Sequence, residues 1–299
     1  MNEAENSSVS SVSENKRTWR LPASLRNPVV IISIIVLLIY IILAVFAPVF
    51  APYDPTDQSY ADRLKAPSPE HWLGTDAYGR DILSRVLYGA RTSLSVGFLA
   101  TAGALVIGTT LGLTAAFFGG WWENIVMRFV DIMNAFPGML LALLLATIFR
   151  GKMTTLIVML MVTQSISFIR QVRAPVLSIK QRDFVEAVKA LGIPKWRIML
   201  VHILPNVISV IVVLATMQIG HAIVLEASLS YLGLGIAPPA PSWGSIMQEG
   251  MGNINTAPWI SVYTGLVLTG LVLSINILGD ALRDQLDPRI RGRRFSTRK

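Results

Sequence analysis

The sequence contains no cysteine, and only 15% of its 299 residues are charged. Without cysteine the chain can form no disulfide, no thiolate metal site and no thiol nucleophile. A soluble domain of this length usually carries about a quarter charged residues. The shortage of charge, together with 53% hydrophobic residues, therefore indicates a membrane protein.

Motifs that carry enzymatic chemistry are also missing. Residues 103–110 come nearest to a phosphate-binding loop, but they lack its lysine and lie within an apolar run. No His-Glu-x-x-His, Gly-x-Ser-x-Gly or Gly-x-Gly-x-x-Gly pattern occurs. We therefore expect no catalytic residue, no metal site, no bound cofactor and no hydrolysis of ATP by this chain.

Long apolar runs predict an all-α integral membrane protein with six transmembrane helices. About 20 apolar residues span the hydrocarbon core as a helix, and a helix satisfies every backbone amide within its own segment. The first run is too long for the core of a signal peptide, so we expect it to be retained. The predicted spans are residues 29–50, 92–118, 132–149, 154–172, 207–231 and 259–281.

The distribution of Lys and Arg predicts the orientation. With the N-terminus in the cytoplasm, 19 of the 26 basic residues fall on the cytoplasmic side, as the positive-inside rule requires. These basic cytoplasmic residues explain the net charge of +8, so we expect no nucleic-acid partner. The expected organisation is a disordered cytoplasmic tail (1–27), a transmembrane domain (28–282) and a basic cytoplasmic tail (283–299). Within the domain, loops 51–91 and 233–258 are expected to be extracytoplasmic and loop 173–206 cytoplasmic.

Small residues recur at every fourth position of the second predicted span: Ala104, Gly108, Gly112 and Ala116. Such a stripe lets another helix approach closely. We expect it to serve packing within the chain rather than a dimer seam.

Several polar residues fall at positions that suggest local structural roles. Ser242 is expected to cap a short helix that runs into Met251. Helical spacing also predicts an ion pair between Arg128 and Asp131, which precede a break expected in the third span at Phe136 and Pro137. The same spacing predicts ion pairs among the charged residues at the end of the last span. These residues are Asp280, Arg283, Asp284 and Asp287.

Residues 183–207, DFVEAVKALGIPKWRIMLVHILPNV, predict two short helices that meet at a glycine. The first is amphipathic, with Phe184, Val188 and Leu191 on one side. Gly192 can adopt the positive φ that ends a helix, and Pro194 suits the first turn of the next one. The second helix is expected to end at Pro205, before the fifth span. The alternative is a helix that lies on the lipid surface.

This segment resembles the EAA loop of ABC importer permeases, whose pattern is Glu-Ala-Ala, three residues, Gly, nine residues, Ile-x-Leu-Pro. Glu186, Ala187, Gly192, Leu204 and Pro205 match at the same spacing. The sequence departs from the pattern at two positions. Val188 replaces the second alanine, and His202 stands where the isoleucine is expected, with Ile203 adjacent. The resemblance implies that the loop inserts into a cytoplasmic ATPase. The residues it assigns to coupling are Asp183, Glu186, Ala187, Ala190, Gly192, Leu204 and Pro205.

Further blocks resemble the dipeptide/oligopeptide/nickel group of these permeases, and within it the second of the two permease types. The blocks are LGTDAYGRDILSRVLYGARTSL (73–94), MRFVDIMNAFPGMLLA (127–142), EASLSYLGLGIAPPAPSWG (226–244) and NILGDALRDQLDPR (276–289). The resemblance implies the type I importer fold in the bacterial inner membrane. It also implies a homologous permease partner, two ATPase subunits that bind ATP and Mg²⁺, and an extracytoplasmic solute-binding protein. Peptides are the expected substrate, with glutathione or nickel complexes as alternatives.

Two sets of residues are candidates for contacts in such a transporter. Glu226, His221 and Gln218 in the fifth span are candidates for the path or its outer gate, because ionisable groups in a membrane are costly unless functional. Glu226 lies near the end of the span, so it could instead be solvated. Trp243, Asp76 and Arg80 are candidates for contact with the binding protein. For the cluster 74–81, however, we favour turn caps and ion pairs that order the loop.

Two other classes of protein remain to be weighed against an importer permease. An ion-coupled carrier or channel usually places carboxylates or broken helices at the bilayer midplane, and spans one, two, four and six lack charges there. A membrane-bound enzyme is disfavoured by the missing metal and nucleophile motifs. Transport by an importer permease requires separate ATPases, whereas transport by an ion-coupled carrier or channel does not. This requirement distinguishes the two classes.

Overall fold

The computed structural model describes residues 27–148 and 152–286, and its regular elements there are helical, as predicted. The N-terminal half contains α1 (Pro28–Val45), α2 (Ala47–Phe50), a 3₁₀ turn (Tyr60–Asp62), α3 (Ile82–Phe118), α4 (Gly120–Asn134) and α5 (Gly138–Ile148). The C-terminal half contains α6 (Met153–Lys180), α7 (Asp183–Ala190), α8 (Lys195–Arg197), a π-helical turn (Ile198–Ile203), α9 (Leu204–Tyr231), α10 (Trp243–Met251) and α11 (Trp259–Leu286). Most of both predicted tails lies outside the described residues.

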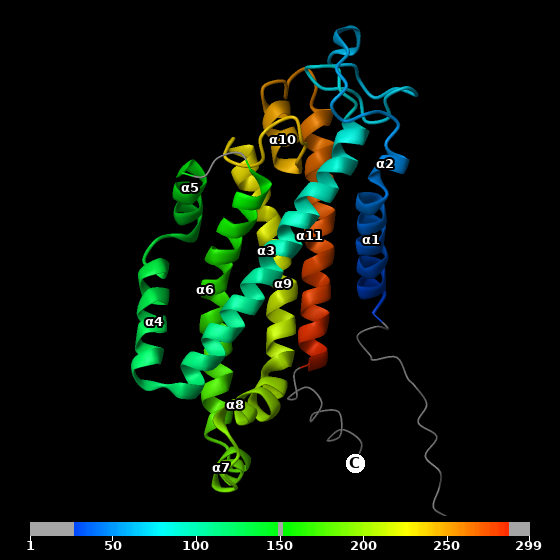
Figure 1. Cartoon of the computed structure of the whole chain (residues 1–299). Helices are drawn as coiled ribbons and strands as arrows, with labels where there is room; N and C mark the ends of the chain where they lie inside the picture. Colours follow the sequence, from blue (N-terminus) through cyan, green and yellow to red (C-terminus); the bar gives the residue numbers. More distant parts are fainter. Residues whose placement is uncertain (1–26, 149–151, 287–299) are drawn as a thin grey trace, which may run out of the picture.

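Four long helices, α3, α6, α9 and α11, form the centre of the bundle (Figure 1). α1 lies on one side of them and the α4–α5 pair on the other. The loop before α3 and the short helix α10 lie at one end of the bundle, whereas α7 and α8 lie at the opposite end (Figure 1). Pro28 and Leu286 are directed toward the α7 end, so the described chain enters and leaves on the same side.

The third predicted span is not one straight helix, and the predicted break at Phe136 and Pro137 is confirmed. Five helical stretches of the described chain are long and apolar enough to cross a membrane, and α4 with α5 forms a sixth only as a pair bent by 87°. The break falls at residues 135–137. Pro137 would clash with the carbonyl four residues earlier in a continuing helix, so α4 ends and a new helix begins at Gly138.

Two other helices, α3 and α6, extend furthest beyond the predicted spans. α3 begins at Ile82, ten residues earlier than expected, because Asp81 caps it by accepting a hydrogen bond from the Ser84 amide at 2.8 Å. α6 passes Pro175 and continues to Lys180. The extra turns project from the apolar segments, so hydropathy alone did not reveal them.

The small-residue stripe packs α3 against α6, which confirms packing within the chain. Ala104, Gly108, Gly112 and Ala116 are all buried. A Cβ built on Gly108 would lie 2.3 Å from the Phe168 Cβ. One built on Gly112 would lie 2.7 Å from the Ile169 carbonyl oxygen. The two backbones therefore approach too closely for any side chain at these positions.

Substitution of Gly112 by Val should destabilise the bundle. The new Cβ meets backbone atoms of Ile169, which cannot rotate away, so overpacking should cost about 1–3 kcal/mol or more. We expect less monodisperse protein after detergent extraction and a lower midpoint of thermal unfolding. Gly138→Val is the matched control, because no atom lies within 4 Å of its Cβ position. Equal stability of the two variants would contradict this packing.

The predicted local ion pairs are wrong within the described residues. Arg128, Asp131, Asp280, Arg283 and Asp284 are exposed, and the ion pairs of this part of the chain include none of them. Helical spacing allows such pairs but stabilises them by only a few tenths of a kcal/mol. Asp287 lies outside the described residues. The pair found instead links α6 to α4, where the Arg173 Nε lies 2.7 Å from a Glu123 carboxylate oxygen.

Candidate functional site

Helix α7 projects from one end of the bundle with most of its surface uncovered (Figure 1). The predicted coupling residues on this segment, Asp183, Glu186, Ala187, Ala190 and Gly192, are all exposed. Asp183 and Glu186 lie in the first turn and Lys189 in the last, an arrangement that complements the helix dipole. The helix therefore presents a charged, small-residue surface beyond the bundle.

A separate apolar face holds α7 to the bundle. Val185 is buried, and Val188 and Ile193 pack against the same cluster. That cluster joins the ends of three long helices through Phe117 of α3, Ile179 of α6 and Val207 of α9, among others. The predicted apolar side was partly wrong, because Leu191 is 77% exposed and Phe184 39%. A displacement of α7 would consequently act on α3, α6 and α9 together.

Gly192 ends α7 as predicted, with φ of +72°. Its amide donates to the Lys189 carbonyl, and the Leu191 amide donates to Ala187. Pro194 follows, but at the capping position of the next helix rather than in its first turn. A side chain at Gly192 would meet no atom within 4 Å, so the glycine is required by the backbone conformation alone.

Pro205 does not end the second helix, and this expectation is corrected. The chain is helical without interruption from Lys195 to Tyr231. A π-helical turn at Ile198–Ile203 precedes the proline, and the Leu204 amide donates to the Met199 carbonyl, five residues back. Such widening accommodates the ring and the missing N–H of a proline. The segment after Gly192 is therefore continuous with the membrane-spanning helix α9.

At the opposite end, a group of four charged side chains links the loop before α3 to α10; Asp76, Arg80 and Arg85 are buried and Glu249 is partly exposed. Asp76 accepts from the Arg80 Nε at 2.6 Å and from Arg85. Glu249 on α10 accepts from the Arg85 Nη1 at 2.7 Å and Nη2 at 3.1 Å, and from Arg80. Two arginines and two carboxylates balance in charge. Together with the Asp81 cap, this confirms the structural interpretation of residues 74–81.

The three residues predicted to contact a binding protein are not available to a partner in this conformation. Asp76 and Arg80 are buried in the charged group, and Trp243 is fully buried, with its indole N–H donating to the Val86 carbonyl at 3.0 Å. Trp243 starts α10, which is capped by Ser242 in a capping box with Ser245, as predicted for this serine. The exposed aromatic side chains of the loop before α3 include Trp72 and Tyr60, each 71% exposed.

The exposed part of this loop also carries a local ion pair. The Asp62 carboxylate accepts from Lys65 and from the Ser59 hydroxyl. The hydrogen bond from Lys65, followed by that from Ser59, holds the pKa of Asp62 below its ordinary value. The same bond raises the pKa of Lys65. Both groups thus keep their charges over the physiological pH range.

Glu226 is buried rather than solvated. Its carboxylate oxygens accept from the Ser93 hydroxyl of α3 and from the Ser230 hydroxyl of α9, each at 2.7 Å. His221 lies on a different side of α9 and is exposed, and Gln218 is half-buried. The structure therefore does not bring these three candidates together. On α11, the exposed Asn276 lies beside α9, its amide oxygen 3.2 Å from the Cβ position of Gly220.

No group of three or more His, Asp or Glu within residues 27–148 and 152–286 has the geometry of a metal site. The chemistry of this part of the chain is thus that of helix packing, exposed charge and buried hydrogen bonds. Helix α7 lies at one end of the bundle, and α10 lies with the loop before α3 at the opposite end (Figure 1).

The sequence was compared with models of protein families. Residues 108–292 match the binding-protein-dependent transport system inner membrane component, and residues 16–67 match the N-terminal transmembrane domain of oligopeptide transport permease C. The chain belongs to the ABC importer permeases. The permease is thus a multi-pass protein of the bacterial inner membrane, a transport subunit and not an ATPase. Such a subunit works with ATPase and binding-protein partners.

Individual relatives divide between two cargoes. The permease is 40% identical to the dipeptide transport system permease protein DppC of Alkalihalophilus pseudofirmus, covering 89% of this chain and 88% of the relative. It is also 40% identical to the glutathione transport system permease protein GsiD of Pectobacterium atrosepticum, covering 91% and 90%. The corresponding protein of Escherichia coli is 41% identical, covering 83% and 82%. The permease therefore belongs to the peptide and glutathione group.

A solved structure shares the fold. The inward-facing methionine ABC transporter MetNI aligns with a TM-score of 0.57 and 21% identity, covering 68% of this chain and 97% of that one. At this identity the likeness establishes the fold alone.

Sequence reasoning missed Val185, which attaches α7 to the bundle, and Glu249, which joins α10 to the charged group. Val185 stands one position away from the predicted apolar face, and the helical period of so short a helix did not reveal it. Arg85 and Glu249 are 164 residues apart, and no local pattern connects them.

Proposed function

We propose that the permease forms half of a translocation path for small peptides together with a homologous permease. Two separate ATPase subunits drive it, and a solute-binding protein delivers the cargo. The observation that carries the proposal is α7, an exposed helix with a charged surface that is anchored to three long helices at once. A soluble ATPase that binds such a helix can move the whole bundle when its own conformation changes.

Small peptides are the proposed cargo because both kinds of relative named above carry peptides, dipeptides in one case and the tripeptide glutathione in the other. The full transporter with its binding protein should take up both classes to different extents in proteoliposomes. Uptake should require ATP and the ATPases. Uptake by the permease alone, driven by an ion gradient, would contradict the proposal.

We place His221 and Gln218 along the path, on the side of α9 that this chain leaves open. His221 has no hydrogen-bond or ion-pair partner among the described residues. An unpaired imidazole facing lipid in mid-span is unfavourable, which supports a position facing the partner permease or water. Asn276 on the adjacent α11 shares this exposure. Glu226, buried between α3 and α9, is proposed to hold the outer gate together rather than to touch cargo.

Reversing the charge of Glu186 should uncouple the permease from its motors. Glu186→Arg places a cation in the first turn of α7, where the helix dipole disfavours it, and inverts the docking surface. We expect co-purification of the ATPases and ATP-dependent uptake to fall to background, with the amount of permease in the membrane unchanged. The measurement is tag-based pull-down followed by uptake assay.

Glu70→Arg is the control for this charge reversal, since Glu70 is exposed in the loop at the opposite end of the bundle. Co-purification of the ATPases should be unaffected in this variant. Normal ATPase binding by the Glu186→Arg variant would contradict the proposal that α7 binds the ATPases.

A further inference from the structure

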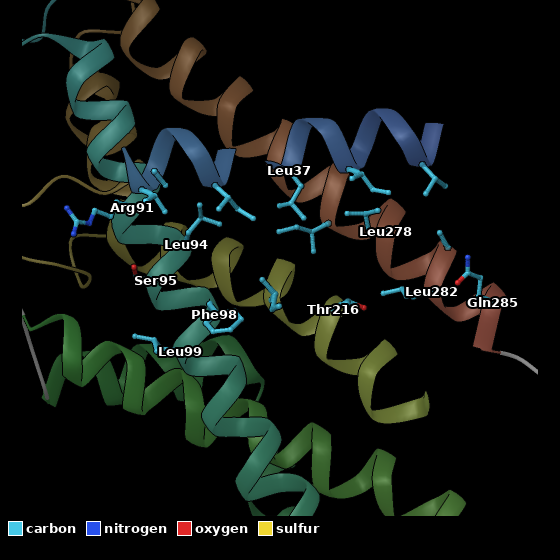
Figure 2. A pocket seen from close by; sticks show the side chains of 18 residues that line it. Leu37, Arg91, Leu94, Ser95, Phe98, Leu99, Thr216, Leu278, Leu282 and Gln285 are labelled. Atoms are coloured by element: carbon cyan, nitrogen blue, oxygen red, sulfur yellow. The ribbon is translucent and has the colours of Figure 1, made fainter. Parts of the chain in front are cut away.

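An apolar groove runs along the inner side of α1, between this helix and α3, α9 and α11 (Figure 2). Its volume is about 880 Å³. Hydrocarbon side chains make up most of the lining, among them Leu37, Ile41, Leu94, Phe98, Ile219 and Leu278. The groove extends from the α10 end of the bundle to the last turns of α11 (Figure 2).

The loose attachment of α1 leaves this groove open. Of the 18 residues of α1, only Val30, Ser33 and Ala44 are buried. The helix is held partly by the Tyr40 hydroxyl, which donates to the Val267 carbonyl of α11 at 2.8 Å. Water would find few hydrogen-bond partners between these walls. In a bilayer the groove must therefore be filled by hydrocarbon.

The size of the groove decides between two sources of hydrocarbon. A helix about 10 Å wide that crosses a core of about 30 Å occupies roughly 2,400 Å³. That exceeds the whole empty space beside α1, which is about 1920 Å³ even when the part open to the surroundings is included. A helix of a partner subunit could lie over the mouth but could not enter. An acyl chain is narrow enough to enter.

Two polar side chains mark the α10 end of the groove. Arg91 and Ser95 lie one turn apart on α3, at the end opposite Leu282 and Gln285 (Figure 2). Arg91 is exposed and makes no ion pair with the described residues, whereas Arg80, Arg85 and Arg173 are all paired. Figure 2 shows its guanidinium directed away from the apolar part. An unpaired cation at the end of an apolar groove is complementary to an anionic lipid headgroup.

We propose that the groove binds one phospholipid with an anionic headgroup, its phosphate at Arg91 and Ser95 and an acyl chain between α1 and the central helices. The guanidinium supplies two or more N–H donors and the serine hydroxyl a further one. The acyl chain then completes the packing that α1 lacks. The lipid would thus belong to the structure of the transporter rather than to the surrounding bulk bilayer.

Photolabelling of the complete transporter tests this site. Phosphatidylglycerol and phosphatidylcholine, each with a diazirine in the acyl chain, are added at equal amounts to the transporter in nanodiscs, and labelled peptides are mapped by mass spectrometry. We expect phosphatidylglycerol to label the facing surfaces of α1 and α3 in preference to phosphatidylcholine. Arg91→Gln should reduce phosphatidylglycerol labelling about five-fold, since one basic residue near a membrane surface contributes about that factor in affinity. Phosphatidylcholine labelling should not change.

Two further variants separate the headgroup from the groove. Lys152→Gln removes an exposed cation at the start of α6, outside the groove, and should leave labelling unchanged. Leu94→Trp fills the groove and should reduce labelling by both lipids. Groove peptides that stay unlabelled while other surfaces are labelled would show that protein covers the groove, and would overturn the proposal. Equal phosphatidylglycerol labelling of wild type and Arg91→Gln would overturn the assigned headgroup site.

Discussion

Gly192→Val should abolish ATP-dependent uptake while the permease still inserts and accumulates normally. The glycine has φ of +72°, and the left-handed region costs a residue with a Cβ about 1–2 kcal/mol. No atom lies within 4 Å of the Cβ position, so the Cβ of the valine itself meets no neighbour. The chain can relieve the strain only by changing the angle between α7 and the helix that continues into α9. The charged surface of α7 would then no longer fit its partner.

Two variants test whether the backbone conformation is the cause. Gly192→Asn adds a side chain of similar size that tolerates positive φ, so we expect it to retain most of the uptake. Gly120→Val introduces the same strain at φ of +61°, also in open space, but at the start of α4. It should leave uptake largely intact. If Gly192→Asn were as inactive as Gly192→Val, side-chain bulk at the docking surface would be responsible instead.

Arg85→Met should destabilise the α10 end of the bundle by about 3–5 kcal/mol, the usual cost of removing one partner from a buried ion pair. Arg85 is 2% exposed and bonds to both Asp76 and Glu249. Its loss leaves the buried carboxylate of Asp76 and the partly exposed carboxylate of Glu249 with Arg80 as the one remaining cation of the group. We expect a lower midpoint of thermal unfolding for the purified transporter. Faster proteolysis of the loop at residues 51–81 should accompany it.

A double variant distinguishes the charge imbalance from a simple loss of packing. Adding Glu249→Gln to Arg85→Met leaves Asp76 and Arg80 as a balanced pair, so part of the stability should return. Lys65→Met removes an exposed partner of Asp62 in the same loop and should produce no measurable change, because exposed pairs contribute little. A double variant no more stable than Arg85→Met would contradict a role for charge balance.

Features that depend on neighbouring residues could be predicted from the sequence. Apolar runs identified most of the membrane helices, Gly192 marked the end of α7, and Ser242 marked the start of α10. Each of these signals acts within a few residues, through hydrogen bonds or sterics of the local backbone. The break before α5 was also predictable locally, from Phe136 and Pro137.

The sequence by itself determined that the chain is helical, crosses the membrane and carries a short charged helix after its fourth predicted span. Only the tertiary structure decided what each polar group does: it buried Glu226 between two serines, joined Arg85 to Glu249, and left Arg91 and His221 uncovered. It also anchored α7 to three helices and left a groove beside α1. The reason is physical, because burial and pairing depend on which surfaces meet when helices distant in the chain pack together. Helical periodicity specifies a face but not its neighbour.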